Sequence, residues 1–563
     1  MASIQNSTQA TAKLRKTEVS EASQASASRG ASTPGEPSLG APNTKKLRKT
    51  EGCQTTTGKR MMSLVHSQGI SLDHLRKITN QLADDGNKIS THLLREIAHA
   101  RFAAAQRVLP LPMDEGEHSW LVADPSLLVP AMVRSSAALE EVFATALQRH
   151  PGTQQDPWHL LITWDEFTPG SVLKPNNHRK SMVVNMSFRE LGRALNHDCC
   201  WWTIAVVRSS IIAKVKGGWP RMLRDLLHRV LLSPTGLQTV GLGLQLKGDF
   251  ANIYCEVGCM LSDGDGLRLA LQWKGPASIH PCFRHWNVLR KDSRRAEHNS
   301  MYVEIACEAS ERFKAWTSNE LTEAVDVTAE AHRQSIGGPM TATRLKEVQK
   351  HLGFRATPEG LLPDPVLRRH IDWMKVLRYD WAHTFLGDGV LGADMWQLIE
   401  AAEKHRLFRQ QDVQGFLQEK WMLPVATRHK QRDLWRIFSE SGRKVNESCH
   451  RVKAGMSDLL GLYGLLRHFV EVRVPAYDGI AVQLRIFQLG CASIDLLLQA
   501  KRHRIALRQA GAKLQTLLEE HLHHPASTPP TSPPSHPIHP AHTPIDPRSR
   551  CISECRFWAS LMS

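Results

Sequence analysis

The sequence has little that marks a membrane or secreted protein. No run of about 18 uncharged apolar residues occurs among the 563 residues, and the nearest one, CCWWTIAVVRSSIIAKV, is interrupted by Arg208 and Lys214. A membrane-spanning helix needs about 20 such residues, so we expect none. The polar N-terminus, MASIQNSTQATAKLRK, lacks an apolar signal core, and the eleven cysteines show no repeating spacing. Both features favour a reducing, intracellular compartment.

Several motifs of catalytic chemistry are absent as well. The chain has no Walker-type phosphate loop, no G-x-G-x-x-G after an expected strand, no G-x-S-x-G and no H-E-x-x-H. Acidic residues are in the minority, since 55 Asp and Glu stand against 71 Lys and Arg, and the net charge is +16. This excess suits a polyanionic partner such as nucleic acid. A solvated basic surface spread over the whole chain is an equally good interpretation.

Composition predicts a globular middle between two tails. Residues 1–58 are rich in Ser, Thr, Ala, Gly and Pro and almost free of large apolar side chains, and residues 524–563 are rich in proline. Neither segment can bury enough apolar surface to offset the entropy lost on ordering, so we predict that both tails are disordered. The length between them suffices for about three or four domains.

Hydrophobic periodicity divides the middle of the chain. Apolar residues at three- and four-residue intervals predict a helical N-terminal region over 59–155. Residues 156–290 contain β-branched and aromatic runs bounded by turn residues, which predict a mixed sheet joined by a helix at 219–233. Helical periodicity returns over 291–440 and 441–523. The expected fold class is α+β or α/β, with a mixed-sheet core and a large helical part.

Two of the expected strands end in aspartate. LLITWDEF ends in Asp165 and Glu166, and the strand period of two places these acids on opposite faces. A later strand ends in Asp263, which Gly-Asp-Gly follows. Two such strand ends can hold a divalent metal, because Mg²⁺ prefers carboxylate oxygens and usually takes one or two of them together with a substrate phosphate. Asp-Gly pairs are also common turn residues, so a plain turn at SDGDG is the competing interpretation.

Longer stretches of the sequence carry a family resemblance. They are WHLLITWDEFTPGSVLKPNNHRKSMVVNMSFREL, WWTIAVVRSS and CMLSDGDGLRLALQWKGPASIHPCF, followed by GLLPDPVLRRHIDWMKVLRYDWAHTFLGDGVLG and RVKAGMSDLLGLYGLL. In this order they resemble transposase-derived proteins of the Kyakuja-Dileera-Zisupton and Plavaka type, in particular transposon-like proteins of dinoflagellates. The last two stretches resemble the family's Asp-x-Met-His segment and Lys-Ala-x-x-x-Glu helix. The resemblance covers about residues 85–520 and implies an RNase H-like mixed-sheet core that the helices of 291–440 interrupt and those of 441–523 complete.

The resemblance also implies a set of site residues. Such proteins are similar to DDE transposases, in which three acids bind two Mg²⁺ or Mn²⁺ ions and cleave or join DNA strands. Carried over residue by residue, the catalytic and metal-binding acids fall on Asp165, Asp263 and Asp458. The family usually has glutamate at the third position, and the aspartate here is one methylene shorter.

Two further pairs have open interpretations. Cys282 and His285 stand where relatives usually have Cys-x-x-Cys, and they could supply half of a tetrahedral zinc site or form a weakly polar surface turn. Asp380 and His383 lie three residues apart on an expected helix and share a face. They could form a buried hydrogen-bonded pair that orients the helical insertion, or they could assist the active site.

Two hypotheses from different classes follow. The first is a metal-dependent DNA strand transferase, a DDE-type transposase that uses Mg²⁺ or Mn²⁺. The second is a catalytically inactive, domesticated DNA-binding or scaffold protein, which the aspartate at position 458 and the broken Cys-x-x-Cys favour. An inert product of transposon decay stays open as a third. The first two predict DNA as the partner, a nuclear location and no membrane, and the sequence leaves the oligomeric state undetermined.

Overall fold

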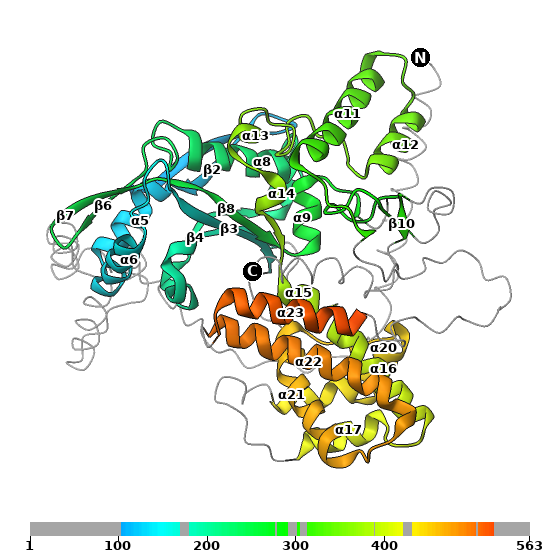
Figure 1. Cartoon of the computed structure of the whole chain (residues 1–563). Coiled ribbons are helices and arrows are strands. Elements are labelled where there is room, and N and C mark those ends of the chain that lie inside the picture. Colours follow the sequence, from blue (N-terminus) through cyan, green and yellow to red (C-terminus); the bar gives the residue numbers. More distant parts are fainter. Residues whose placement is uncertain are drawn as a thin grey trace, which may run out of the picture. The chain divides into compact units, whose positions relative to one another are not determined.

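The computed structural model describes residues 103–168, 180–275, 278–290, 301–304, 312–387, 389–419, 431–502 and 505–522. All of them belong to one unit, Arg60–Ser563. The two tails predicted to be disordered, 1–58 and 524–563, lie outside the described residues, as do the helices expected before residue 103. The described chain forms a seven-stranded mixed sheet followed by a large helical region, which confirms the expected mixed α/β class (Figure 1).

The sheet combines antiparallel and parallel strands in the order β1-β2-β5-β4-β3-β8-β11. Each neighbouring pair from β1 to β3 is antiparallel, whereas β3, β8 and β11 run parallel. The strands are β1 (Gln106–Pro112), β2 (Glu117–Ala123), β3 (Trp158–Phe167), β4 (Ser181–Phe188), β5 (Trp202–Arg208), β8 (Cys255–Ser262) and β11 (Leu377–Tyr379).

Strand β3 lies inside the sheet, and its two faces differ. Every second residue from Trp158 to Trp164 is buried, whereas the residues between them are only half-buried. This period of two packs one face of the sheet against a hydrophobic core. Full burial of a large apolar side chain contributes about 1.5–3 kcal/mol, so the core fixes which face each β3 residue occupies.

The sheet begins earlier in the chain than the sequence predicts. Residues 106–123 were expected to be part of a helical region, but they form a β-hairpin, β1 and β2. Two features explain the difference. Trp120 and Val122 are buried and alternate with the exposed Ser119 and Leu121, which is the period of a strand. Pro110 and Pro112 lie in β1, at the edge of the sheet, where a missing N–H is tolerated.

Helices and two small sheets surround the main sheet. The helix expected at 219–233 is confirmed as α8 (Gly218–Leu227) with a π-helical turn, η4 (His228–Leu232). The other helices are α5 (Pro125–Arg134), α6 (Ala137–Arg149), α7 (Ser209–Ile212), α9 (Gly264–Leu271), α11 (Ser318–Gly337), α12 (Ala342–Leu352), α13 (Leu367–His370) and α14 (Trp373–Val376), with 3₁₀ turns η2 (Arg189–Asn196) and η3 (Asp198–Cys200). The small sheets pair β6 (Leu242–Leu246) with β7 (Asp249–Ile253) and β9 (Val288–Leu289) with β10 (Val303–Glu304).

The helical region has a hydrophobic core of its own. Helices from both sides of residue 440 contribute to it, and Figure 1 shows α16, α17, α21, α22 and α23 gathered together. Its elements are α15 (Trp381–Phe385), α16 (Val390–Lys404), α17 (Gln410–Gln418), α19 (Gln431–Leu434), η7 (Trp435–Phe438), α20 (Glu440–Cys449), α21 (Met456–Arg473), η8 (Asp478–Ile480), α22 (Ala481–Lys501) and α23 (Leu507–Leu522).

One described segment, Asp478–Lys501, is long and apolar enough to cross a membrane by length and composition alone. Of its most apolar window, 56% is buried inside the structure. A core helix of a soluble protein passes the same test, so this segment gives only weak support for a membrane span.

A buried ion pair connects the last helix to the rest of this core. Asp394 of α16 and His521 of α23 approach to 2.9 Å, and the Asp394 side chain has no exposed surface. Gly490 of α22 allows the close approach, because a Cβ there would lie 3.1 Å from Asp394 Oδ2. The pair therefore fixes where three helices meet.

We expect Asp394→Ala to lower the free energy of unfolding by about 2–4 kcal/mol, because it leaves the His521 ring buried without its acceptor. Denaturant unfolding followed by circular dichroism measures this change. Asp433→Ala is the matched control, since Asp433 is exposed and pairs with Arg436 on the surface; its effect should stay within about 0.5 kcal/mol. Equal losses in the two variants would contradict a structural role for the buried pair.

Candidate functional site

Two of the acids predicted from the sequence lie at neighbouring strand ends. Thr163 of β3 is the register partner of Leu261 of β8, and the two strands are parallel. Asp165 lies two residues beyond Thr163 in β3, and Asp263 lies two residues beyond Leu261, directly after the last residue of β8. The negative charge of Asp263 acts on Asp165, in agreement with this placement. Since carboxyl ends of parallel strands meet at one edge of a sheet, strand geometry alone brings the two acids together.

A third acid continues the row. Strand β11 pairs with β8 through Tyr379 and Ser262, and the backbone N–H of Asp380 donates to the Ser262 carbonyl at 2.9 Å. Asp380 therefore follows β11 as Asp263 follows β8. The helix that the sequence predicts for Asp380 and His383 is present as α15, with Asp380 as its N-cap, and the short strand β11 directly before it was not predicted.

Hydrogen bonds around Ser262 hold the strand ends in place. Ser262 Oγ donates to the Trp164 carbonyl at 2.8 Å, and Trp164 Nε1 donates to the Gly266 carbonyl at 3.1 Å. Gly266 lies so close to this network that a Cβ there would overlap Ser262 Oγ. Only glycine fits, and the contact fixes α9 against the ends of β3 and β8.

Asp263 has a structural role of its own. Its Oδ1 accepts the Gly266 backbone N–H at 2.5 Å and caps the N-terminus of α9. An aspartate cap satisfies a helix N–H that would otherwise lack a partner and places negative charge at the positive end of the helix. The competing interpretation of SDGDG as a plain turn is wrong, because Gly-Asp-Gly begins α9, but Asp263 does have a local structural role as the cap of that helix. The cap uses one carboxylate oxygen and leaves Oδ2 to other partners.

Asp380 and His383 form the hydrogen-bonded pair that the sequence predicts. Asp380 Oδ2 lies 2.6 Å from His383 Nδ1, and Asp380 Oδ1 accepts the Ala382 backbone N–H at 3.0 Å, which caps α15. Both side chains are half-buried. Asp380 thus orients the imidazole and commits its Nδ1, so that Nε2 is the nitrogen left for a further partner.

The charges of this row shift two pKa values upward. Partial burial raises the pKa of Asp165, and the neighbouring charges of Asp263 and Asp380 raise it further, against an opposing effect of His383 and of the Glu166 N–H. The hydrogen bond to Asp380 raises the pKa of His383, and the charges of Asp380, Asp263 and Asp165 add to it. Asp165, Asp263, Asp380 and His383 are therefore within electrostatic reach of one another, and we call them the acidic row.

Glu166 has partners outside the acidic row. Its carboxylate accepts from Lys180 Nζ at 2.8 Å and from Ser209 Oγ at 2.6 Å. Partial burial alone would raise the pKa of Glu166, but these two hydrogen bonds and the Lys180 charge lower it. The two acids that are adjacent in the sequence thus have opposite pKa shifts, because the strand period gives them different surroundings.

Asp458 lies in the first turn of α21, outside the row. Within the described ranges, no three His, Cys, Asp or Glu side chains lie together in a way that could hold a metal ion. The structure thus brings Asp165 and Asp263 together and does not group Asp458 with them. The start of α21 is nevertheless near the row, since Gly387 has His383 on one side and Met456 on the other.

Cys282 and His285 are adjacent, as the half-site interpretation requires. Cys282 Sγ lies 3.4 Å from His285 Nδ1, and Cys282 belongs to a small hydrophobic cluster. Burial and the nearby Arg284 lower the pKa of His285 to about 4, so its imidazole is neutral at pH 7. The described part of the chain supplies no third ligand beside them.

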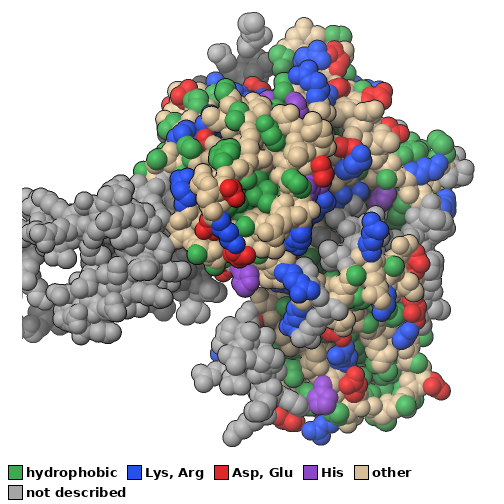
Figure 2. Space-filling model, turned by 60° about the vertical axis from the view of Figure 1, so that its left-hand side comes forward, with side chains coloured by type: hydrophobic (Ala, Val, Ile, Leu, Met, Phe, Trp, Pro, Cys, Tyr) green, Lys and Arg blue, Asp and Glu red, His purple; other side chains and the backbone are tan. Residues whose placement is uncertain are grey.

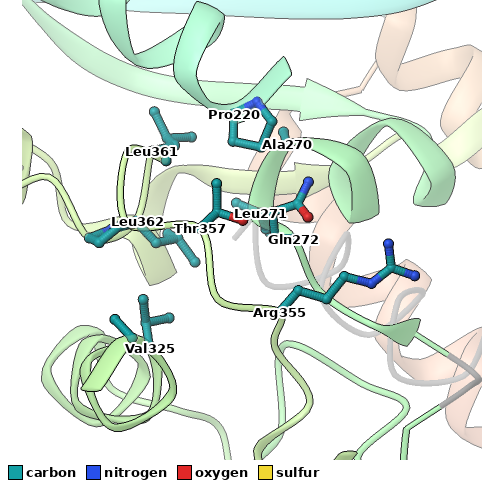
Figure 3. A pocket seen from close by; sticks show the side chains of 12 residues that line it. Pro220, Ala270, Leu271, Gln272, Val325, Arg355, Thr357, Leu361 and Leu362 are labelled. Carbon is teal, nitrogen blue, oxygen red and sulfur yellow. The ribbon is translucent and has the colours of Figure 1, made fainter. Parts of the chain in front are cut away.

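A pocket elsewhere in the structure is separate from the acidic row. It is lined by side chains that include Pro220 of α8, Leu271 of α9 and Val325 of α11 (Figure 3). None of the acids of the row lines it. The chemistry that the sequence predicts is therefore placed at an open sheet edge and not in this pocket.

No protein-family model matches the chain, and no curated protein matches it either. The resemblance to transposase-derived proteins stays a prediction that rests on the sequence motifs.

We expect Asp165→Asn to raise the melting temperature of the metal-free chain at pH 7. The folded surroundings raise the pKa of Asp165, so its ionised form opposes folding above that pKa, and asparagine removes this charge. The gain should vanish as the pH falls towards about 3, where Asp165 is protonated in both the folded and unfolded states. Thermal unfolding at a series of pH values measures it.

Glu166→Gln is the matched control with the opposite sign. Because the folded pKa of Glu166 is lowered, its charge stabilises the fold above the unfolded pKa, and this contribution is lost as the pH falls through the folded pKa. The variant should therefore melt at a lower temperature than the unaltered chain at pH 7. A lower melting temperature for Asp165→Asn as well would show that the charge of Asp165 does not oppose folding.

A titration of His383 tests the Asp380 contact. We expect its imidazole pKa to lie above the usual 6.5 and to fall in Asp380→Asn, which removes the charge of the partner. Because the folded pKa is raised, the pair stabilises the fold below about pH 6.5 and this contribution is lost as the pH rises through the folded pKa. NMR titration, with His383→Gln to assign the resonance, gives both values. An unchanged pKa in Asp380→Asn would contradict the pairing.

Proposed function

We propose that this chain is a transposase-like protein that cleaves or transfers DNA strands with metal ions held by Asp165 and Asp263. One observation carries the proposal: Asp165 near the end of β3 and Asp263 directly after β8 lie at the same end of two adjacent parallel strands. There burial raises the pKa of Asp165, and the charge of Asp263 raises it further. Such a pair at an accessible sheet edge favours binding of a cation over a purely structural role.

The strand arrangement supports an RNase H-like core. In that fold, a central strand has two strands in antiparallel pairing on one side and two parallel strands on the other. Here β5, β4 and β3 are antiparallel, and β8 and β11 follow β3 in parallel, which gives the order β5-β4-β3-β8-β11. Strands β1 and β2 extend the same sheet beyond β5. The two acids then lie on the central strand and directly after its parallel neighbour.

The donor atoms suit a hard cation. Carboxylate oxygens are the ligands that Mg²⁺ and Mn²⁺ prefer, and Mg²⁺ usually takes one or two carboxylates with a substrate phosphate. Asp165 and Asp263 would hold it, and a cation would relieve the repulsion that raises the pKa of Asp165. When bound, such ions activate the attacking hydroxyl or water and stabilise negative charge on the phosphate.

His383 has the position of a proton carrier in this proposal. Its Nδ1 is committed to Asp380, and the raised pKa keeps part of the imidazole protonated near neutral pH. Nε2 can then donate a proton to the oxygen that leaves the phosphate. Asp380 acts through the imidazole, which makes it a positioning residue.

Two residues compete for the role of the third carboxylate, Asp380 and Asp458. Asp380 continues the row in register, but both of its oxygens already serve α15 and His383. Asp458 is the residue that the family resemblance indicates, and it lies just beyond Met456, which approaches Gly387 beside His383. We keep Asp458 as the third acid in the proposal. Substitution of Asp458 distinguishes it from Asp380 in this role.

A second candidate function has a specific observation in its favour. Among the described residues no three acids are arranged to hold a metal, and the resemblance gives Asp458 where glutamate is usual. A DNA-binding or scaffold protein that keeps the sheet without the chemistry fits both facts. Both candidates bind DNA, which also places the protein in the nucleus as part of the proposal.

Nicking of supercoiled plasmid by the full chain, with Mg²⁺ or Mn²⁺ and with EDTA, separates the two candidates. We expect metal-dependent conversion to open circles, and a loss of roughly a hundredfold or more in Asp165→Asn and Asp263→Asn, since changes even behind metal ligands cost ten- to a hundredfold. Asp458→Asn should match them if it is the third acid, and His383→Gln should alter the pH profile.

The controls are neighbours in the sequence that lie outside the acidic row. Glu166→Gln changes the next residue, and Asp265→Asn changes an exposed acid that pairs with Arg268. Both should retain the nicking rate of the unaltered chain. Absence of nicking with either metal would support the non-catalytic candidate, and nicking that survives both Asp165→Asn and Asp263→Asn would reject this site.

A further inference from the structure

A group of four basic side chains lies at the far end of α9 from Asp263. Lys274 follows the C-terminus of α9, and Arg355 follows α12. Lys346 and Lys350 are four residues apart on α12, so they lie on the same face one turn from each other. The charges of Arg355, Lys350 and Lys346 all act on Lys274, in agreement with a common location of the four side chains. We call them the basic cluster.

Backbone pairing brings the two chain segments together. The Lys274 N–H donates to the Gly353 carbonyl at 2.7 Å, and the Arg355 N–H donates to the Gln272 carbonyl at 2.8 Å. The residues between these bonds, Trp273 and Phe354, form an antiparallel bridge and are both buried. The convergence of the cations is thus fixed by a buried contact and does not depend on flexible side chains alone.

The basic cluster has no acidic partner in the part of the chain that the structure describes. Nearby cations do have one, since Arg268 pairs with Asp265 and Arg344 with Glu347. Burial and the three like charges lower the pKa of Lys274. Charges of both signs are interspersed over the face in Figure 2, as on an ordinary protein surface. Four uncompensated cations in one place therefore oppose folding unless an anion joins them.

We infer that the basic cluster binds the phosphate backbone of a DNA strand whose scissile phosphate lies at the acidic row. Only the placement of the scissile phosphate at the acidic row rests on the proposed function. The eight residues of α9 separate the two groups, and a helix rises 1.5 Å per residue, so α9 spans about 12 Å. At about 3.4 Å per nucleotide, that is three to four nucleotides along one strand.

The side chains favour DNA phosphates over an acidic protein. Three of the four are lysine, which is depleted in protein–protein interfaces and binds phosphate as a point charge. Lys346, Lys350 and Arg355 are exposed, as contacts to a polymer that passes over the surface require. The net charge of +16 adds a long-range attraction for a polyanion.

Fluorescence anisotropy of a short labelled DNA duplex, titrated with the full chain in EDTA at several salt concentrations, tests the inference. The test variant changes all four residues of the basic cluster to glutamine. With four phosphate contacts removed, the slope of log affinity against log salt should fall by about 3 to 4, and affinity at low salt should fall at least tenfold. The double variant Lys346→Gln with Lys350→Gln changes only the exposed face of α12 and leaves the buried bridge intact. Its salt slope should fall by about half as much as in the quadruple variant.

The matched control changes Lys214, Lys216, Lys404 and Lys501 to glutamine, which are exposed lysines elsewhere. Both quadruple variants lower the net charge from +16 by 4 to +12, so overall charge is equal between them. An equal loss in the two variants, an unchanged slope, or no DNA binding by the unaltered chain at low salt would overturn the inference. Displacement of DNA by polyglutamate at equal charge concentration would overturn it in favour of an acidic protein partner. Because EDTA removes metal, a failure of nicking leaves the result for the basic cluster intact.

Discussion

The parallel pairing of β3, β8 and β11 is the constraint on which the candidate site depends. Parallel strands deliver their carboxyl ends to one edge of a sheet, and here Asp165 lies near the end of β3, while Asp263 and Asp380 directly follow β8 and β11. Ser262 ties the three together, because its hydroxyl donates to β3 and its carbonyl accepts from Asp380. The core holds the strands so firmly that three carboxylates are kept near one another against their mutual repulsion. Charges of one sign held together in this way cost the fold stability.

Much of the sheet could be predicted from the sequence, because its strands are long enough to show a period. Strands β3, β4, β5 and β8 have seven to ten residues each, and the strand period in β3 by itself assigns Asp165 and Glu166 to opposite faces. The pairing of Asp380 with His383 was also predictable, since both side chains are polar and three residues apart. Local sequence patterns were also enough to predict that Asp165 and Asp263 lie near the ends of strands.

Other parts of the fold and the site could not be read in this way. Strand β11 has three residues, too few for a period, and it forms only because β8 presents a free edge to it. The sequence therefore shows the helix that Asp380 caps but not the strand that brings Asp380 to the sheet edge beside Asp263. The hairpin at 106–123 follows an alanine-rich segment that favours helix, and tertiary pairing overrides that preference. The position of Asp458 outside the acidic row depends on how the helices pack, and the spacing of residues in the sequence does not record that packing. The basic cluster likewise depends on a bridge between segments some eighty residues apart.

The contact between Gly266 and Ser262 has a consequence for how such a sequence can change over time. Any side chain at 266 would meet the Ser262 hydroxyl, yet that hydroxyl adds a hydrogen bond from the end of β8 to the Trp164 carbonyl of β3. A single substitution at 266 would push α9 away from the strand ends, while loss of the hydroxyl first would free the space but loosen the sheet. The two positions are thus coupled, and a change at either one alters how α9, β8 and β3 meet beside Asp165 and Asp263.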